Sequence, residues 1–259
     1  MRDQNLFKDK VVWLTGASSG IGKELSIQLA ELGAKLVLSS RKEELLQALK
    51  EGLPNSKEHL VLPLDLTRSS DFESALNQVI AQYGCVDYLI QNGGVSQRGT
   101  AADSTETVVR KIMEVNFFGN VLLTRVVLPE LRKSKGQILV ISSIAGKFGF
   151  FLRSSYSASK HALHGYYESL ALEEEENGIA VTIACPGKIN TPISSNAVGS
   201  DGQKHGQMDH NQEKGMPVEE CVSQLLNALS TKKREVLIGN REIKAVTLKR
   251  FLPALFWRV

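Results

Sequence analysis

The chain has 259 residues, and its 31 Lys and Arg against 28 Asp and Glu give a formal net charge of +3. This mild charge, without a basic patch interleaved with aromatic residues, argues against nucleic acid as a partner. Three cysteines without metal or redox spacing indicate reduced thiols in a reducing compartment, and there is no run of about 18 apolar residues that would predict a transmembrane helix. The first residues show no hydrophobic leader, so we expect a cytoplasmic protein that is not secreted.

Short apolar runs alternate with helical patterns from Val11 to Cys185. Such alternation predicts an α/β fold, with a doubly wound parallel sheet that carries helices on both faces. No internal repeat, proline-rich linker or low-complexity tract interrupts the pattern. We therefore expect one Rossmann domain over residues 1–259.

A glycine-rich turn follows the first expected strand, Lys10–Thr15, and runs from Gly16 to Gly22. A helical pattern begins there and ends at Gly33. The glycines allow a positive φ and close backbone approach, and the start of a helix offers free N–H groups to a pyrophosphate. The strand before the turn and the helix after it are the context that a dinucleotide site needs.

Arg41 follows the next expected strand, Lys35–Leu38, where a cofactor without a 2′-phosphate usually finds an acidic residue. A guanidinium can bind a phosphate through two hydrogen bonds. This predicts NADP(H) in preference to NAD(H). The alternative is that Arg41 is an ordinary surface charge.

Tyr156 and Lys160 lie four residues apart, on one face if a helix forms here, and Ser143 stands upstream at the end of the apolar run Ile138–Ile141. A hydroxyl, a phenol and an ammonium that converge on one carbonyl oxygen would form a proton-transfer site. At about 4 Å the ammonium would lower the pKa of the phenol toward neutrality, by up to about 3 units in a dry pocket. By itself, Tyr-x-x-x-Lys also recurs by chance on solvated helices.

These motifs occur together with others in one order: Thr15-Gly-Ala-Ser-Ser-Gly-Ile-Gly22, Asp65, Asn92-Gly-Gly94, Asn116, Ser143, Tyr156, Lys160, Pro186-Gly187 and Thr191. In this order and spacing the chain resembles a short-chain dehydrogenase/reductase, from about residue 8 to about residue 240. As a set, the motifs are highly specific.

The resemblance implies a cofactor site. Its pyrophosphate side would be lined by Gly16, Ser18, Ser19, Gly20, Ile21 and Gly22. Asp65 and Leu66, at the end of an expected strand over Leu60–Leu64, would border the adenine, and Asn92 would support the sheet and the cofactor. The nicotinamide carboxamide would contact Pro186, Gly187, Ile189 and Thr191.

The resemblance also implies catalytic roles. Ser143 would hydrogen-bond the substrate oxygen and Tyr156 would transfer the proton. Lys160 would bond the nicotinamide ribose and lower the pKa of the tyrosine. Asn116, on a long helix expected near 105–132, would hold a water in a proton relay.

Two features distinguish the chain within this family. Gly93 replaces the alanine of the common Asn-Asn-Ala-Gly motif, a loss of one methyl that should leave the cofactor site intact. The segments 92–98 and 159–163 are similar to the branch of dehydrogenase/reductase SDR family member 7 and its relatives. That branch implies membrane anchorage, so membrane association is the alternative to a purely cytoplasmic location.

A polar stretch over about residues 192–216 is rich in Ser, Gly, Gln, His and Asp. Long loops of this kind are often lids, and in the family the corresponding segment closes over the substrate. We expect Ile193, Val198 and Met208 to form part of the pocket wall. His161 and His164 have no carboxylate or cysteine at ligand spacing, so we expect no metal site.

The C-terminal segment, about residues 241–259, combines basic residues with Phe251, Leu252, Leu255, Phe256 and Trp257. This amphipathic composition suits peripheral contact with a membrane. The slightly favoured alternative is a helix packed over the substrate mouth or against a neighbouring subunit, because the stretch is short and Pro253 would kink it.

The combined prediction is an NADP(H)-dependent oxidoreductase that interconverts a carbonyl and a secondary alcohol on a fairly apolar small molecule, such as a steroid, retinoid or lipid ketone. The alternative is an NAD(P)-binding sensor or scaffold with little turnover. An epimerase or dehydratase would need a larger C-terminal domain. By analogy with the family, the helices near 105–132 and 154–176 would pair in a homodimer or homotetramer.

Overall fold

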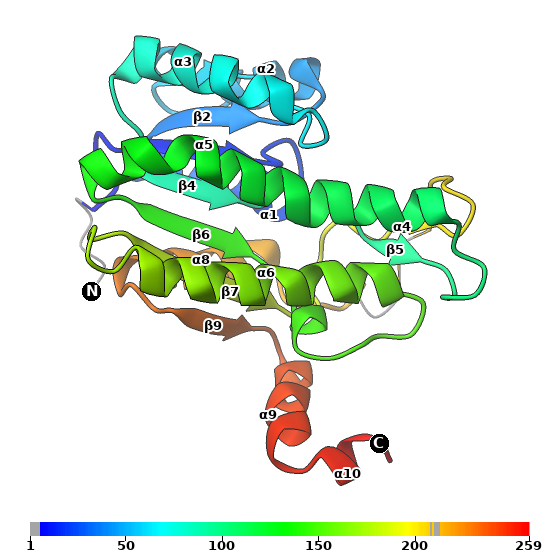
Figure 1. Cartoon of the computed structure of the whole chain (residues 1–259). Helices are drawn as coiled ribbons and strands as arrows, with labels where there is room; N and C mark the ends of the chain where they lie inside the picture. Colours follow the sequence, from blue (N-terminus) through cyan, green and yellow to red (C-terminus); the bar gives the residue numbers. More distant parts are fainter. Residues whose placement is uncertain (1–5, 208, 210–212, 259) are drawn as a thin grey trace.

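A parallel seven-stranded sheet forms the centre of the molecule (Figure 1). The computed structural model describes residues 6–207, 209 and 213–258. Within them the strand order is β3-β2-β1-β4-β6-β7-β9. The strands are β1 Val11–Thr15, β2 Lys35–Ser39, β3 Leu60–Val61, β4 Tyr88–Gln91, β6 Gln137–Ile141, β7 Ala180–Pro186 and β9 Glu235–Ile238.

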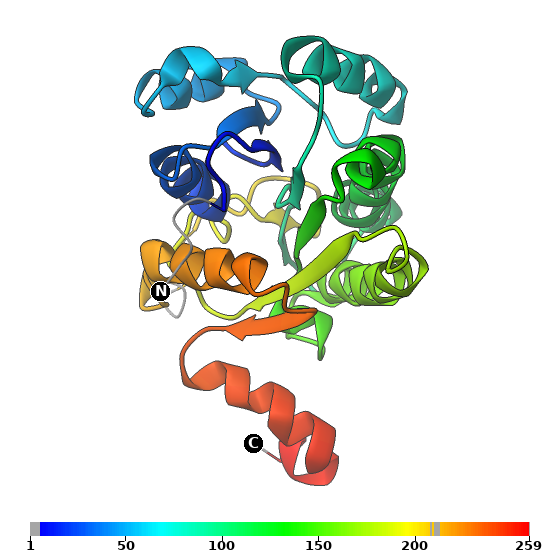
Figure 2. The same cartoon turned by 90° about the vertical axis from the view of Figure 1, so that its left-hand side faces the viewer.

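Helices cover both faces of this sheet (Figure 2). One face packs against α1 Gly20–Glu31, α2 Glu43–Glu51 and α8 Val218–Ser230, and the other against α3 Phe72–Tyr83, α5 Gly119–Ser134 and α6 Ser154–Glu173. Successive side chains of a strand point to opposite faces, so β1 divides its fully buried residues between the two cores. The predicted doubly wound Rossmann fold is confirmed.

The third strand is shorter than the sequence predicted. Only Leu60 and Val61 pair as β3, whereas the expected strand extended to Leu64. Pro63 lacks an N–H group, which is tolerated here because β3 is the edge strand of the sheet. The chain nevertheless continues alongside β2, because the N–H groups of Leu62 and Leu64 donate to the carbonyls of Leu38 and Ser40, both at 3.0 Å.

The expected long helix near 105–132 consists of α4 Glu106–Met113, a π-helical turn Glu114–Phe118, and α5. Together they form the single helix of the described chain that is long and apolar enough to cross a membrane, Glu106–Ser134. Apolar side chains of this helix also pack in the core of the domain, where Leu123, Val127 and Leu131 are buried against the sheet.

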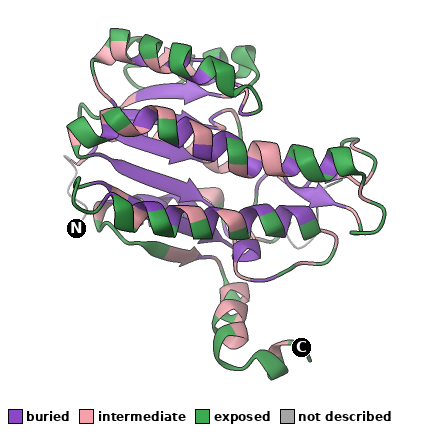
Figure 3. Ribbon diagram, in the orientation of Figure 1, coloured by how far each residue is buried: buried purple, intermediate pink, exposed green. Residues whose placement is uncertain are grey.

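The C-terminal helices α9 Lys244–Phe251 and α10 Pro253–Phe256 project away from the sheet (Figure 1) and contain no buried residue (Figure 3). Pro253 begins α10, so the chain breaks where the proline predicted. Phe256 contacts Phe148, with ring centroids 5.1 Å apart. Around that contact, Phe251 and Trp257 are 70% and 73% exposed.

Candidate active site

A cavity of about 920 Å³ lies at the carboxyl ends of the parallel strands. It extends from the turn after β1, past the ends of β4 and β6, to the segment that follows β7. In open α/β sheets, ligands bind outside the carboxyl ends of the strands where the strand order reverses. Here the reversal lies between β1 and β4.

The glycine-rich turn lines one end of the cavity. Gly16 and Gly20 have φ values of +67° and +53°, and Ser19 is the N-cap residue of α1. A Cβ atom at Gly22 would lie 2.1 Å from the Gly16 carbonyl oxygen, so only glycine fits. The turn therefore brings backbone N–H groups and the start of a helix to the cavity wall, which fits a pyrophosphate.

Thr15, at the end of β1, and Asn92, directly after β4, hold this turn in place. The Thr15 hydroxyl accepts hydrogen bonds from the N–H groups of Asn92 and Gly93, and Asn92 Nδ2 donates to the carbonyls of Thr15 and Gly16 at 3.1 and 3.0 Å. A Cβ atom at Gly93 would lie 2.6 Å from Leu66 Cδ1. The Leu66 side chain therefore occupies the space that the methyl group of an alanine at position 93 would need.

Arg41 and Lys42 border the cavity just after β2, together with Asp65 and Leu66. Arg41 is exposed, so its guanidinium is accessible to a ligand. Burial raises the pKa of Asp65, but hydrogen bonds from Thr67 and the charges of Arg41 and Arg68 outweigh it and lower that pKa overall. Asp65 is therefore ionised at neutral pH.

Tyr156 and Ser143 come together at the other end of the cavity. Tyr156 lies in the first turn of α6, is 7% exposed, and its phenol hydrogen-bonds the Ser143 side chain. Ser143 follows β6, and its hydroxyl also accepts from the Ala145 N–H at 3.1 Å. The structure thus brings the predicted hydroxyl pair into contact.

Lys160 lies one turn further along α6 and is buried. Its Nζ donates to the Ile141 carbonyl at 2.8 Å and is 5.7 Å from the centre of the Tyr156 ring. Burial lowers the pKa of Lys160 to about 8.

The expected effect of Lys160 on the tyrosine is not seen in the structure. Burial raises the pKa of Tyr156, and the groups that oppose this rise are the Ser143 hydrogen bond and the charges of Arg153 and Arg98. Lys160 Nζ lies over the ring and is not among the groups that lower the pKa of the phenol. A lowering of the phenol pKa by the Lys160 ammonium therefore stays a prediction.

Asn116 lies in the π-helical turn, fully buried. Its Nδ2 donates to the Val95 carbonyl at 2.9 Å and to Ser159 Oγ at 3.0 Å, while its Oδ1 accepts from the Val95 N–H at 2.8 Å. A Cβ atom at Gly94 would lie 3.2 Å from this Oδ1 and 3.6 Å from Lys160 Nζ. The fold thus groups Asn116 with Lys160, and the water relay remains a prediction.

The chain after β7 forms the remaining wall. Pro186, Gly187, Ile189, Thr191, Ile193 and Val198 line the cavity, as the sequence predicted, whereas Met208 lies outside the described residues. In the short strand β8, Val198–Gly199 pairs with β5, Gln97–Arg98, and so ties the segment 192–216 to the body. No described residue beyond Asp209 lines the cavity, so the C-terminal helices do not cover its mouth within this chain.

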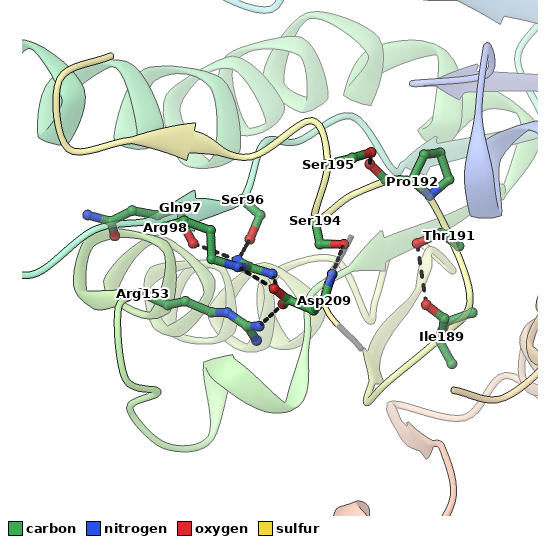
Figure 4. A network of polar contacts seen from close by, with 10 residues as sticks. All are labelled: Ser96, Gln97, Arg98, Arg153, Ile189, Thr191, Pro192, Ser194, Ser195 and Asp209. Atoms are coloured by element: carbon green, nitrogen blue, oxygen red, sulfur yellow. Dashed lines mark hydrogen bonds and ion pairs between the residues drawn. The ribbon is translucent and has the colours of Figure 1, made fainter. Parts of the chain in front are cut away.

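Sequence reasoning missed a group of residues around Tyr156. Gln97 Oε1 accepts from the backbone N–H groups of Ser155 and Tyr156, at 2.8 and 3.2 Å, and so fixes the start of α6. Arg98 and Arg153 both pair with Asp209 (Figure 4). Partners separated by 56 to 111 positions form no local motif, so the sequence carried no signal for them.

The environment of His164 also differs from the prediction. Cys185 and Glu235 lie close enough to His164 for the three side chains to share an ion. The Lys147 ammonium lies 3.1 Å from His164 Nδ1 and pairs with Glu235. A cation thus already occupies the position beside the carboxylate. His161 hydrogen-bonds the Ser157 carbonyl of its own helix.

Comparisons with known proteins place this geometry among its relatives. A family profile described as short chain dehydrogenase matches residues 10–201. Dehydrogenase/reductase SDR family member 7B of Mus musculus is 38% identical over 266 residues, covering 100% of this chain and 82% of the relative. Dehydrogenase/reductase SDR family member 7 of Homo sapiens is 38% identical over 257 residues, covering 96% and 76%. The resemblance proposed from the motifs is confirmed.

Two solved structures are similar over nearly their whole length. A short-chain dehydrogenase from Streptomyces avermitilis gives a TM-score of 0.82 at 26% identity, covering 97% of this chain and 95% of that one. A short-chain dehydrogenase/reductase from Burkholderia phymatum, solved in complex with NAD, gives 0.83 at 22% identity, covering 96% and 95%. At this identity the second likeness shows the fold alone.

Proposed function

This chain belongs to the short-chain dehydrogenase/reductase family, and is thus an oxidoreductase, and we propose that it uses NADP(H) to interconvert a carbonyl and a secondary alcohol. The family implies a small-molecule substrate and a nucleotide cofactor. The proposed substrate is fairly apolar, such as a steroid, retinoid or lipid ketone. Apolar side chains of Val95, Val115, Ile144, Phe150 and Ile193 line the cavity beside Tyr156 and support this class.

The pairing of Tyr156 with Ser143 in a cavity shared with the glycine-rich turn carries the proposal. A bound nicotinamide supplies the hydride in this chemistry. Ser143 orients the carbonyl oxygen of the substrate, and Tyr156 donates the proton to it. Because burial raises the pKa of Tyr156, the phenol is neutral at pH 7, which favours its use as an acid in the reducing direction. Lys160 and Asn116 form the proposed path that returns a proton to Tyr156 after each reduction.

The choice of NADP(H) over NAD(H) rests on Arg41 and Lys42, two cations that line the cavity just after β2, where a cofactor without a 2′-phosphate usually finds an acidic residue. Arg41→Asp should lower kcat/KM for NADPH about 10- to 100-fold, since hydrogen bonds to charged groups contribute about 1.5–3 kcal/mol. Glu51→Gln, at the far end of α2, is a matched control for surface charge. A native preference for NADH would overturn the assignment.

A screen of carbonyl compounds with NADPH, followed by the loss of its absorbance, tests the activity itself. Ser143→Ala should keep the affinity for NADPH and reduce turnover of the best substrate about 10²-fold or more. If the protein binds NADPH tightly yet reduces no member of a broad panel, a cofactor-binding sensor or scaffold becomes the better account.

We propose that the segment 192–216 acts as the lid of the substrate site. It supplies cavity-lining residues on one side, and its contacts with the body include β8, the ion pairs of Asp209 and the hydrogen bond from the Thr105 N–H to the Ser200 carbonyl. Limited proteolysis within this segment should slow when cofactor and substrate are both present. Unchanged cleavage would contradict the lid.

We propose that residues 241–259 contact a membrane surface peripherally. Exposed Phe251, Leu252, Leu255 and Trp257 lie beside Lys249 and Arg250, a composition suited to the interface of an anionic bilayer. Sedimentation with phosphatidylserine vesicles should fall for Phe251→Ser with Trp257→Ser, but stay unchanged for Leu172→Ser, an exposed apolar residue of α6. Equal sedimentation of all three proteins would end this idea.

We also propose a homodimer or homotetramer that pairs through α5 and α6. Phe118, at the start of α5, and Leu172, near the end of α6, are 44% and 63% exposed apolar side chains on these helices. Light scattering should report a multiple of the 28.4 kDa chain, and Phe118→Glu should shift it toward the monomer. A monomer in the native protein would contradict the assignment.

A further inference from the structure

The substrate end of the cavity is more basic than a site for a wholly uncharged molecule needs. Besides Lys160 and Lys188, five charged residues line this part of the cavity: Arg98, Lys111, Arg153, Lys204 and Asp209. Four of them are cations and one is an anion. Lys111 and Lys204 are exposed, whereas Arg98 and Arg153 have side chains only 6% and 26% accessible. Buried cations are costly unless they are paired, so their partners decide the character of the site.

Arg98 is fully engaged (Figure 4). Its Nη1 donates to Ser96 Oγ at 2.9 Å and to the Gln97 carbonyl at 2.6 Å, while Nε and Nη2 bind the two carboxylate oxygens of Asp209. Asp209 is fixed in turn, because its N–H donates to Ser194 Oγ at 3.2 Å. Arg98 and Asp209 thus form one neutral, bidentate pair.

Arg153 is the cation left over. Its Nη2 donates to the Asp209 oxygen that Arg98 already binds, at 2.8 Å. Its Nε is buried and has no hydrogen-bond partner among the residues that the structure describes. One carboxylate shared by two guanidinium groups leaves a net charge of +1 in this part of the cavity. The buried Nε is closed to a ligand, but the guanidinium lines the cavity and is partly accessible, so an anion bound here would balance the charge.

The position of Arg153 relates this charge to the reacting group. Arg153 is the N-cap residue of α6, three residues before Tyr156. Its guanidinium lies 5.5 Å from the centre of the Phe150 ring, so an apolar wall adjoins the charge. A ligand that extends from Tyr156 along this wall would meet a carbonyl-reducing group, an apolar surface and an unpaired cation in turn.

We propose that Arg153 binds an anionic group of the substrate, so that the natural substrate is an amphiphilic carbonyl compound with a carboxylate or phosphate. This inference rests on the proposed function and narrows its substrate class. Lys111 and Lys204 at the rim attract such a molecule, and Asp209 holds Arg98 so that Arg153 alone takes the anion. The apolar body lies against Phe150 and the neighbouring aliphatic side chains.

Binding of chain-matched probes to the complex with NADP⁺ tests this. Calorimetry with decanoate, decyl phosphate and decanamide separates the charge from the chain, and the two anions distinguish a carboxylate site from a phosphate site. At least one anion should bind about 10- to 100-fold more tightly than the amide, as expected for a charge-assisted contact. Arg153→Met should remove this preference, and Arg153→Lys should retain part of it.

Two further variants sharpen the test. Asp209→Asn removes the competing carboxylate and should strengthen anion binding, whereas Lys35→Gln, a charge change away from the cavity lining, should leave it unchanged. Unaltered NADP⁺ affinity of Arg153→Met shows that this variant has folded. The proposal is overturned if no probe binds, if the amide binds as tightly as the anions, or if Arg153→Met keeps the preference. Reduction of an uncharged ketone that depends on Ser143 would then still support the proposed function.

Discussion

The two ends of the cavity are built in different ways. The glycine end comes from one continuous stretch, β1, the turn and α1, and its wall is backbone held at close quarters. The Tyr156 end is assembled from side chains on β5, the start of α6 and the segment 192–216, whose partners are up to 111 positions apart. Changes at the first end should therefore act through sterics and stability, and changes at the second through charge and proton transfer.

The largest effect on stability is expected at the glycine end. In Gly22→Ala the new Cβ atom would lie 2.1 Å from the Gly16 carbonyl and 2.5 Å from Asn92 Nδ2, so the backbone must move. We expect a loss of about 3 kcal/mol or more in the free energy of unfolding, and of measurable NADPH binding, in denaturant titrations and calorimetry. Native-like stability and binding would show that this wall is not tightly packed.

Gln97 tests the assembled end, because it reaches the catalytic helix from another element. Gln97→Ala leaves the N–H groups of Ser155 and Tyr156 without their acceptor and should lower kcat up to about 10²-fold through misplacement of the phenol. Gln97→Glu keeps an acceptor and should recover part of the rate. The dissociation constant for NADPH should stay within about 3-fold of the native value. This is less than the change of about 1.4 kcal/mol in binding free energy that a tenfold effect requires. An equal loss of kcat and of NADPH affinity would contradict the distinction between the two ends of the cavity.

The pH dependence should follow Lys160. Burial lowers its pKa to about 8, so the side chain is charged below that pH and neutral above it. If the charge assists proton delivery, kcat/KM for reduction should fall as pH rises through about 8. Lys160→Arg keeps the charge, and its descending limb should move to higher pH. A limb that stays in place would assign the titration to another group.

The smallest effect is expected at a glycine outside both ends. Gly165 lies within α6, and a Cβ atom there would meet nothing within 4 Å. Gly165→Ala should raise the free energy of unfolding by about 0.5–1 kcal/mol without a change in kcat or cofactor binding. Gly165→Ala is the matched control for Gly22→Ala. If Gly165→Ala also destabilises the protein, the loss in Gly22→Ala comes from replacing a helical glycine and not from the packing of the turn.

The same contrast explains what the sequence could predict. The turn from Gly16 to Gly22 and the helical pair Tyr156 and Lys160 have local spacing, so their positions followed from periodicity and from the family resemblance. The π-helical turn at Asn116 and the end of regular strand pairing at Val61 depend on the packing of the fold. The position of Lys160 Nζ on the Ile141 carbonyl, and the Arg98, Asp209 and Arg153 group, depend on side-chain placement across the fold. No pattern of residues close together in the sequence could predict these contacts.

The central claim is that Tyr156 transfers a proton in a site that binds its cofactor independently. Tyr156→Phe removes one oxygen and leaves the ring in its buried place. On the best carbonyl substrate, kcat should fall about 10²- to 10⁴-fold while the dissociation constant for NADPH stays within about 3-fold. Undiminished turnover in this variant, with NADPH bound normally, would contradict the account.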